Sequence, residues 1–179
     1  MMPEPIESVR TTTRFTARTF DVVEECIRLA TGTLARHVTV RHPGAAVILP
    51  RDDDGSLIVI TQYRHSVRKS LLEFPAGTLE PGEDPLVCAK RELAEEAGQL
   101  ARQWHSLGEL HPAPGFCSET QYCFLATGLS PCDTHYDEDE RIDITTMTSA
   151  QVAEAIRTGA MTDGKSIAIY ARAKLSGLV

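Results

Sequence analysis

The chain has 179 residues, of which 42% are hydrophobic and 24% are charged, and its formal net charge is −7. These values suit a single globular domain, and no apolar run reaches the roughly 18–20 residues of a membrane-spanning helix. The negative charge disfavours non-specific binding to nucleic acid, and it would also repel an anionic substrate unless cations intervene. The first residues lack the basic and apolar regions of a signal peptide, so a cytoplasmic location is the default expectation.

The N-terminal quarter of the chain predicts strands after a polar start. Residues 1–11 contain two prolines and are expected to form a flexible terminus. Residues 12–41, rich in Thr, Val, Phe and Arg, predict strands with a turn at Thr31-Gly32-Thr33. Apolar strands are predicted at 45–49, 57–62 and 70–74, and three adjacent acids at 52–54 fit a tight hairpin turn better than a metal site.

The remaining three quarters of the chain, residues 42–179, predict the main domain. A helix should run from about Pro85 to Ala97, with Asp84 as N-cap and Gly98 after its end. Strands are predicted at 104–111, 120–127 and 142–147. They are followed by a helix from Thr148 to Gly159 and by a last helix capped by Asp163, with Ile167, Tyr170 and Leu175 on its apolar side. This order indicates an α+β layered structure. Five cysteines without a CxxC pair predict reduced thiols.

The helix at 85–97 carries an unusual set of acids. Leu86, Ala89, Leu93 and Ala97 fall on one side of the helix, and Glu92, Glu95 and Glu96 fall on a neighbouring stripe. Like charges three or four residues apart cost a helix about 0.2–0.5 kcal/mol per pair. A solvated acidic face is one interpretation. The other is a site for a hard cation, Mg²⁺ or alternatively Mn²⁺, with Glu83 close by and Arg91 orienting one carboxylate.

A longer pattern favours the cation site. Its fixed positions are Gly77, Glu83, Arg91-Glu92-Leu93, Glu95-Glu96 and Gly98. Eight such positions at average usage match by chance about once in 10⁹ starting points. The pattern resembles the Nudix box, and this resemblance implies that Glu92, Glu95 and Glu96 bind divalent metal, that Glu83 contributes, and that the backbone carbonyl of Ala76 is a further ligand. The last position, usually aliphatic in the family, is Gln99 here, and Leu100 is expected to supply the missing apolar contact.

Segments outside the box are similar to the ADP-ribose pyrophosphatase subfamily. They are HPGAAV (42–47), QYR (62–64), EFPAG (73–77) and APGF (113–116), and Pro114 lies 16 residues after Gly98. The resemblance implies a Nudix-type α/β/α sandwich with a mixed sheet and N-terminal antiparallel strands. It also implies Mg²⁺-dependent hydrolysis of ADP-ribose to AMP and ribose 5-phosphate, and a homodimer formed through residues 12–41.

The same resemblance implies roles for residues around the metals. Arg64, and Arg41 less directly, would contact a substrate phosphate, although position alone fits a surface ion pair equally well. Glu119 would hold the ribose and the loop at Phe116 would contact the substrate. Phe20 is a candidate for stacking on adenine. The acidic run at 137–140 would supply the general base, with Glu138 the first choice and Glu140 the second; on its own, the run fits a solvated loop.

Two other functions fit the sequence. The nearer one keeps the chemistry but changes the small-molecule substrate to another nucleoside diphosphate sugar. The other is a Nudix-fold ligand sensor without catalysis, although such proteins commonly lose carboxylates of the box, and this chain has all of them.

Overall fold

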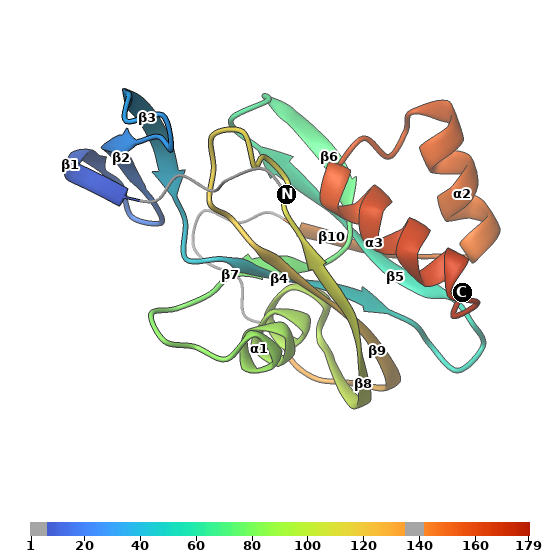
Figure 1. The fold of residues 1–179 in the computed structure, drawn as a ribbon. Helices are drawn as coiled ribbons and strands as arrows, with labels where there is room; N and C mark the ends of the chain where they lie inside the picture. Colours follow the sequence, from blue (N-terminus) through green and yellow to red (C-terminus); the bar gives the residue numbers. More distant parts are fainter. Residues whose placement is uncertain (1–6, 135–141) are drawn as a thin grey trace. The chain divides into compact units, whose positions relative to one another are not determined.

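The computed structural model describes residues 7–134 and 142–179. Contacts within the chain divide it into two compact units (Figure 1). The N-terminal unit contains residues 1–44 together with 111–120, and the larger unit contains residues 45–110 and 121–179.

The N-terminal unit is a three-stranded antiparallel sheet. Its strands β1 (Glu7–Thr16), β2 (Asp21–Arg28) and β3 (Leu34–Arg41) lie in the order β1-β2-β3. Strand β1 begins at Glu7, which pairs with Arg28, so it extends into the segment that the sequence placed in a flexible terminus. The segment 111–120 joins this unit because the amide of Val40 donates to the carbonyl of Phe116 at 2.7 Å.

The larger unit contains two sheets. The first is mixed, with the order β7-β4-β9-β8: β4 (Ala45–Pro50) is parallel to β9 (Gln121–Pro131) and antiparallel to β7 (Ala76–Thr78), and β8 (Gln99–Leu110) is antiparallel to β9. The second is antiparallel, with the order β10-β5-β6, and consists of β10 (Ile142–Met147), β5 (Leu57–Arg64) and β6 (Lys69–Glu73).

The predicted hairpin between residues 45–49 and 57–62 is wrong in its pairing. The tight turn exists, since the amide of Asp52 donates to Ser56 O at 2.8 Å and Gly55 has φ +87°. The two strands, however, belong to different sheets and share only an isolated bridge between Arg51 and Leu57. The apolar residues of β4 are buried on both faces, so this strand needs neighbours that the turn does not provide.

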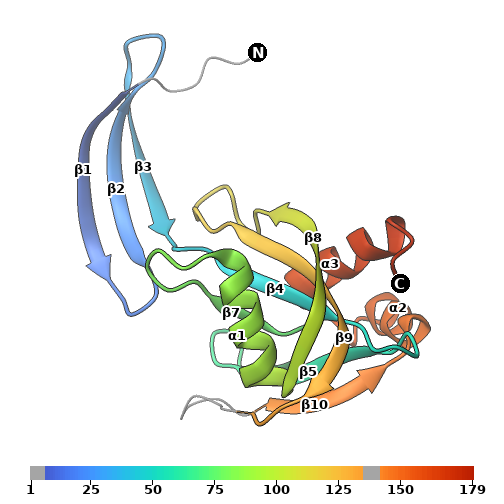
Figure 2. The same cartoon turned by 90° about the horizontal axis from the view of Figure 1, so that it is seen from below.

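Helices cover both sides of the sheets (Figures 1 and 2). Helix α1 (Pro85–Ala97) packs with Ala46 and Ile48 of β4, whereas α2 (Ser149–Thr158) and α3 (Gly164–Leu175) pack with Val47 and Leu49. Because successive strand residues point to opposite faces, one buried strand serves both cores. The α/β/α sandwich with a mixed sheet and N-terminal antiparallel strands is therefore confirmed.

The capping residues of the three helices agree with the sequence prediction, whereas the apolar face of the last helix differs from it. Asp84, Thr148 and Asp163 cap the three helices, and Thr148 forms the capping box with Gln151. Leu175, expected on the apolar side of the last helix, is 89% exposed, and Ser166, Ile169 and Ala173 are buried there with Tyr170. Leu100 is 53% exposed and does not replace the aliphatic contact at Gln99.

All five cysteines are free thiols. Within residues 7–134 and 142–179, no helix is long and apolar enough to cross a membrane.

Candidate metal and phosphate site

The loop before α1 places Glu83 at the helix. Glu83 and Glu80 close a turn, in which the amide of Glu83 donates to Glu80 O at 3.0 Å and the Glu83 carboxylate accepts from the amide of Glu80 at 2.9 Å. Gly82, at φ +77°, allows this turn. Asp84 then accepts from the amides of Leu86 and Val87 and starts α1. The acid before the helix is thus held beside the acids on it.

Arg91 joins three of the predicted metal ligands. Its Nη1 donates to Glu92 Oε1 at 2.6 Å and to Glu95 Oε2 at 3.1 Å. Its Nε and Nη2 contact the two carboxylate oxygens of Glu83 at 3.2 and 3.1 Å. The hydrogen bonds from Arg91 hold the pKa of Glu83 below its ordinary value. The sequence predicted that Arg91 orients one carboxylate, and the structure shows that it binds three.

Gly77 is required by the position of Glu92. A Cβ atom at residue 77 would lie 1.8 Å from Glu92 Oε1 and 1.9 Å from the carboxyl carbon. Residue 77 is part of β7, where it pairs with Ala46 of β4, so the backbone cannot retreat without breaking the sheet. The glycine is therefore needed for the close approach of a carboxylate, while its φ lies outside the left-handed region.

Glu96 is bound at the other end of the same stripe. Its side chain is buried, and Oε2 accepts from the amide of Ala76 at 2.8 Å. Ala76 pairs with Val47 in the mixed sheet, so this hydrogen bond ties the end of α1 to the start of β7. Glu96 and Ala76, two of the predicted ligands, are therefore adjacent.

The donor set suits a hard divalent cation. Carboxylate oxygens from one helical turn and the preceding loop are the ligands that Mg²⁺ and Mn²⁺ prefer. A single nitrogen of Arg91 reaches both Glu92 and Glu95, so these carboxylates lie within range of one positive charge. In the described part of the chain, no three His, Cys, Asp or Glu side chains already surround a common point, and Arg91 lies among three of the carboxylates. The residues fit a metal site once these contacts to Arg91 are exchanged.

Arg64 forms a part-buried ion pair with Glu73. Its Nε and Nη2 donate to both oxygens of Glu73 at 2.8 and 2.7 Å, and the Glu73 side chain is 1% exposed. Lys165 of α3 contacts the same carboxylate and also Asp163 Oδ2, the latter at 3.0 Å. Burial acts to raise the pKa of Glu73, but the hydrogen bonds and charges of Arg64 and Lys165 outweigh it and the net pKa is lowered. Neither Glu73 nor Lys165 was predicted from the sequence as a site residue, and the two lie 92 residues apart in the chain.

Other candidate residues lie in the N-terminal unit or outside the described residues. Arg41 ends β3 with its Nη2 3.9 Å from Glu25 Oε1. Phe116 is 62% exposed, and Phe20 and Glu119 are half-buried. The base candidates Glu138 and Glu140 lie outside the described residues. The chain before them is held at α1, because the amide of Cys132 donates to Gly98 O at 2.9 Å, and the chain after them enters β10, where Ile142 pairs with Gln62.

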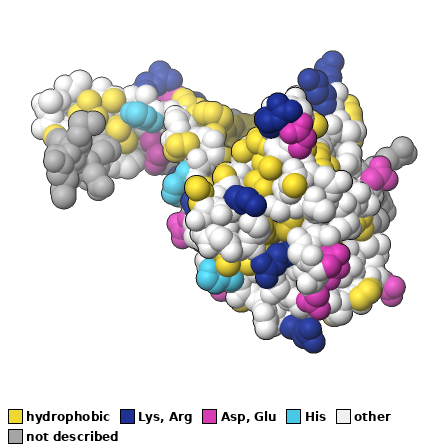
Figure 3. Space-filling model, turned by 90° about the vertical axis from the view of Figure 1, so that its right-hand side faces the viewer, with side chains coloured by type: hydrophobic (Ala, Val, Ile, Leu, Met, Phe, Trp, Pro, Cys, Tyr) yellow, Lys and Arg dark blue, Asp and Glu magenta, His cyan; other side chains and the backbone are white. Residues whose placement is uncertain are grey.

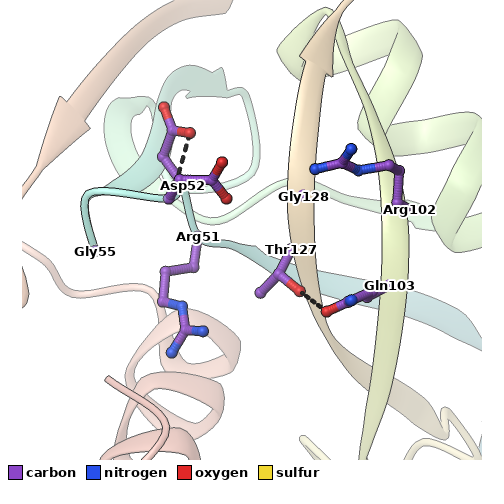
Figure 4. Close-up of a pocket in the computed structure, with 8 residues that line it drawn as sticks. Arg51, Asp52, Gly55, Arg102, Gln103, Thr127 and Gly128 are labelled. Carbon is purple, nitrogen blue, oxygen red and sulfur yellow. Dashed lines mark hydrogen bonds between the residues drawn. The ribbon is translucent and has the colours of Figure 1, made fainter.

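A separate surface depression of about 250 Å³ contains none of these residues (Figure 4). It lies where the β4–β5 turn meets β8 and β9, and its lining includes Arg51, Asp52, Arg102 and Thr127. Arg51 is already bound to the carbonyl of Leu178. The depression therefore does not contribute to the carboxylate site.

Comparison with known proteins identifies the family. The NUDIX domain model matches residues 40–168. The chain is 36% identical to the ADP-ribose pyrophosphatase of Mycobacterium tuberculosis over 88% of this chain and 76% of that protein. It is 32% identical to the ADP-ribose pyrophosphatase of Bacillus subtilis over 85% and 83%, and 32% identical to the methanol dehydrogenase activator of Bacillus methanolicus over 90% and 88%.

The chain therefore belongs to the Nudix family. The expectation of a Nudix pyrophosphohydrolase, drawn from the box and the flanking segments, is confirmed at this level. Among solved structures, an ADP compounds hydrolase has the same fold, with a TM-score of 0.84 over 100% of this chain and 99% of that one, at 23% identity.

Proposed function

We propose that this protein hydrolyses the pyrophosphate of ADP-ribose to AMP and ribose 5-phosphate, and that Mg²⁺ is its cofactor. The observation that carries the proposal is the carboxylate cluster at α1, in which Glu83, Glu92 and Glu95 share one cationic side chain and Glu96 is buried beside Ala76. The names of its relatives in two bacteria support ADP-ribose as the substrate.

The carboxylates of Glu92, Glu95 and Glu96, with Glu83 and the carbonyl of Ala76, would hold the metal. Bound Mg²⁺ would neutralise the pyrophosphate and lower the pKa of a coordinated water. Such neutralisation allows a chain of net charge −7 to bind an anion. Arg91 would exchange its contacts with Glu92 and Glu95 for the ion and keep orienting Glu83, which it contacts through two nitrogens.

Residues outside the cluster would bind the substrate. Arg64 would donate to a phosphate, and in this interpretation its ion pair with Glu73 fixes the guanidinium plane. Arg41, Phe116 and Glu119 would contact the remainder of the substrate, with Glu119 on the ribose. Glu138, or otherwise Glu140, would take a proton from the attacking water, which typically supplies about 10²–10⁴ in rate.

Exposed apolar side chains in the N-terminal unit support a homodimer. Val9, Phe15, Leu34 and Val38 are 45–59% exposed, and apolar groups are visible on the surface of this sheet in Figure 3. In the proposal these strands meet a second copy of the chain. Size-exclusion chromatography with light scattering should give the dimer mass for the wild type and the monomer mass for Phe15→Ser/Val38→Ser. A wild-type monomer would remove this part of the proposal. The cytoplasmic location stays a prediction.

The metal role is tested with Glu96→Gln, assayed with Mg²⁺ and ADP-ribose. We expect turnover to fall at least about a hundredfold, because the neutral amide cannot replace a carboxylate ligand. Glu109→Gln is the matched control: Glu109 is an exposed acid on β8 and should keep wild-type turnover. If Glu96→Gln retains more than about a tenth of the activity, the metal assignment is wrong.

The base and the substrate need separate experiments. Glu138→Gln should slow turnover without weakening metal binding, and a slower Glu140→Gln enzyme would reverse the assignment. A panel of ADP-ribose, GDP-mannose, UDP-glucose and other nucleoside diphosphate sugars, read by phosphatase-coupled phosphate release, ranks the substrates by kcat/KM. Preference for another sugar would favour the first alternative, and absence of turnover on every compound would favour the ligand sensor.

A further inference from the structure

A part-buried group of four charged residues lies where β5, β6 and α3 meet. Arg64 ends β5, Glu73 ends β6, and Asp163 and Lys165 belong to the first turn of α3. The Glu73 carboxylate accepts from two nitrogens of Arg64 and from Lys165, and Lys165 also contacts Asp163. The charges of the two cations and the two anions cancel, and charges removed from water are tolerated when they are paired in this way.

The group is anchored by a second contact between the same elements. Ser166 is fully buried, its hydroxyl donates to Asp163 Oδ2 at 2.6 Å, and it accepts from the amide of Phe74 at 2.7 Å. The residue after Glu73 is therefore bound to the residue after Lys165. This double connection fixes Glu73 relative to the start of α3.

The bidentate pair determines how Arg64 can act. It uses Nε and Nη2, which leaves Nη1 outside the pair. The charge of Glu96 contributes to the raised pKa of Arg64, after the hydrogen bond to Glu73, so this guanidinium lies within electrostatic range of the carboxylate cluster. An arginine whose rotamers are already fixed loses less entropy when it binds a phosphate.

We infer that Lys165 is a positioning residue, which acts through the buried Glu73 carboxylate to fix Arg64 where it meets a phosphate of the substrate. This inference rests on the proposed function, because it assumes a pyrophosphate at the carboxylate cluster. Without Lys165, the Glu73 carboxylate keeps Arg64 as its one cationic partner among these four residues, and both side chains can shift. The consequence is weaker substrate binding with little change in the chemical step.

The test is a double-mutant cycle with Lys165→Met and Arg64→Ala, using the full chain with Mg²⁺. Lys165→Met should raise KM for ADP-ribose about tenfold and change kcat less than about threefold. This result indicates that the substitution removes a binding interaction which the ground state and the transition state share. In the Arg64→Ala background the same substitution should change KM less than about twofold, because the residue through which it acts is gone.

Further measurements separate positioning from a general structural effect. Dissociation constants for a non-hydrolysable, methylene-bridged ADP-ribose analogue, measured by titration calorimetry, should follow the KM values. Lys174→Met is the matched control, since Lys174 is an exposed lysine of the same helix and its hydrogen bond goes to Ser149. If Lys165→Met does not fold, Lys165→Gln, which keeps a polar side chain, replaces it in the cycle.

Two results would overturn the inference: an unchanged KM for the Lys165 variants, or an equal rise in KM with and without Arg64. Failure of the proposed function would look different, since wild-type protein would then leave ADP-ribose intact. In that case the cycle is run on the nucleoside diphosphate sugar that the panel selects, or on analogue binding alone.

Discussion

Gly77→Ala should inactivate the enzyme while leaving the fold intact. The added Cβ would lie 1.8 Å from Glu92 Oε1, whereas non-bonded carbon and oxygen atoms approach to about 3 Å at the closest. The carboxylate must therefore move by more than about 1 Å, and a displacement of this size at a reacting centre costs about 10² in rate. This corresponds to about 2.7 kcal/mol of transition-state stabilisation.

Stability should change much less than activity. The atoms displaced are the end of a flexible side chain, and replacing Gly by Ala restricts the unfolded chain by about 0.4–1 kcal/mol. This gain partly offsets loss of the Glu92–Arg91 ion pair. The experiment measures kcat with Mg²⁺, Mn²⁺ affinity by calorimetry, and the melting temperature. Gly164→Ala is the matched control, since residue 164 has open space and ordinary φ. A Gly77→Ala enzyme with more than a tenth of wild-type kcat would refute the proposed role of Glu92.

Three further predictions test the energetics of the larger unit. Leu93→Ala, which removes a fully buried side chain of α1, should lower the free energy of unfolding by about 2–5 kcal/mol in a urea titration, whereas Leu175→Ala, at an exposed site, should change it by less than about 0.5 kcal/mol. Arg91→Gln leaves the carboxylates uncompensated, so Mg²⁺ should raise its melting temperature at least about 2 °C more than that of the wild type; equal shifts would contradict the role of Arg91. The folded pKa of Glu73 is lowered, so its stabilising contribution is present above the unfolded pKa of about 4.3 and is lost as the pH falls through the folded value. The free energy of unfolding of Glu73→Gln should therefore depend less on pH below about pH 4.5 than that of the wild type. An identical pH dependence of the two unfolding free energies would exclude this linkage.

Features determined by local spacing were predictable from the sequence. Helix α1 begins and ends at the expected residues because Asp84, Pro85 and Gly98 act within one turn of it. The box fixes which acids share a helix face, and Arg91 contacts Glu95 because residues four apart on a helix are neighbours. The order of elements was sufficient to predict the layered α+β fold.

Features that depend on distant pairing were not predictable. Glu73 and Lys165 read as ordinary charged residues until β6 and the start of α3 are placed together. Residues 99–103 belong to β8, an edge strand whose partly exposed side chains lack a clear apolar alternation. Gly77 signalled a special backbone position, but its purpose, close contact with Glu92, became visible only in three dimensions.

The composition of the N-terminal unit limits how the gene can be shortened. Residues 111–120 leave the larger unit after β8, pair with β3 through Val40, and return at β9. A truncation that starts at Ala45 would remove β3. The ten residues 111–120, which include Phe116 and Glu119, would then lose the strand to which they are hydrogen-bonded. The three N-terminal strands are consequently a built-in scaffold for a loop from the middle of the chain, and they should be inherited and expressed together with it.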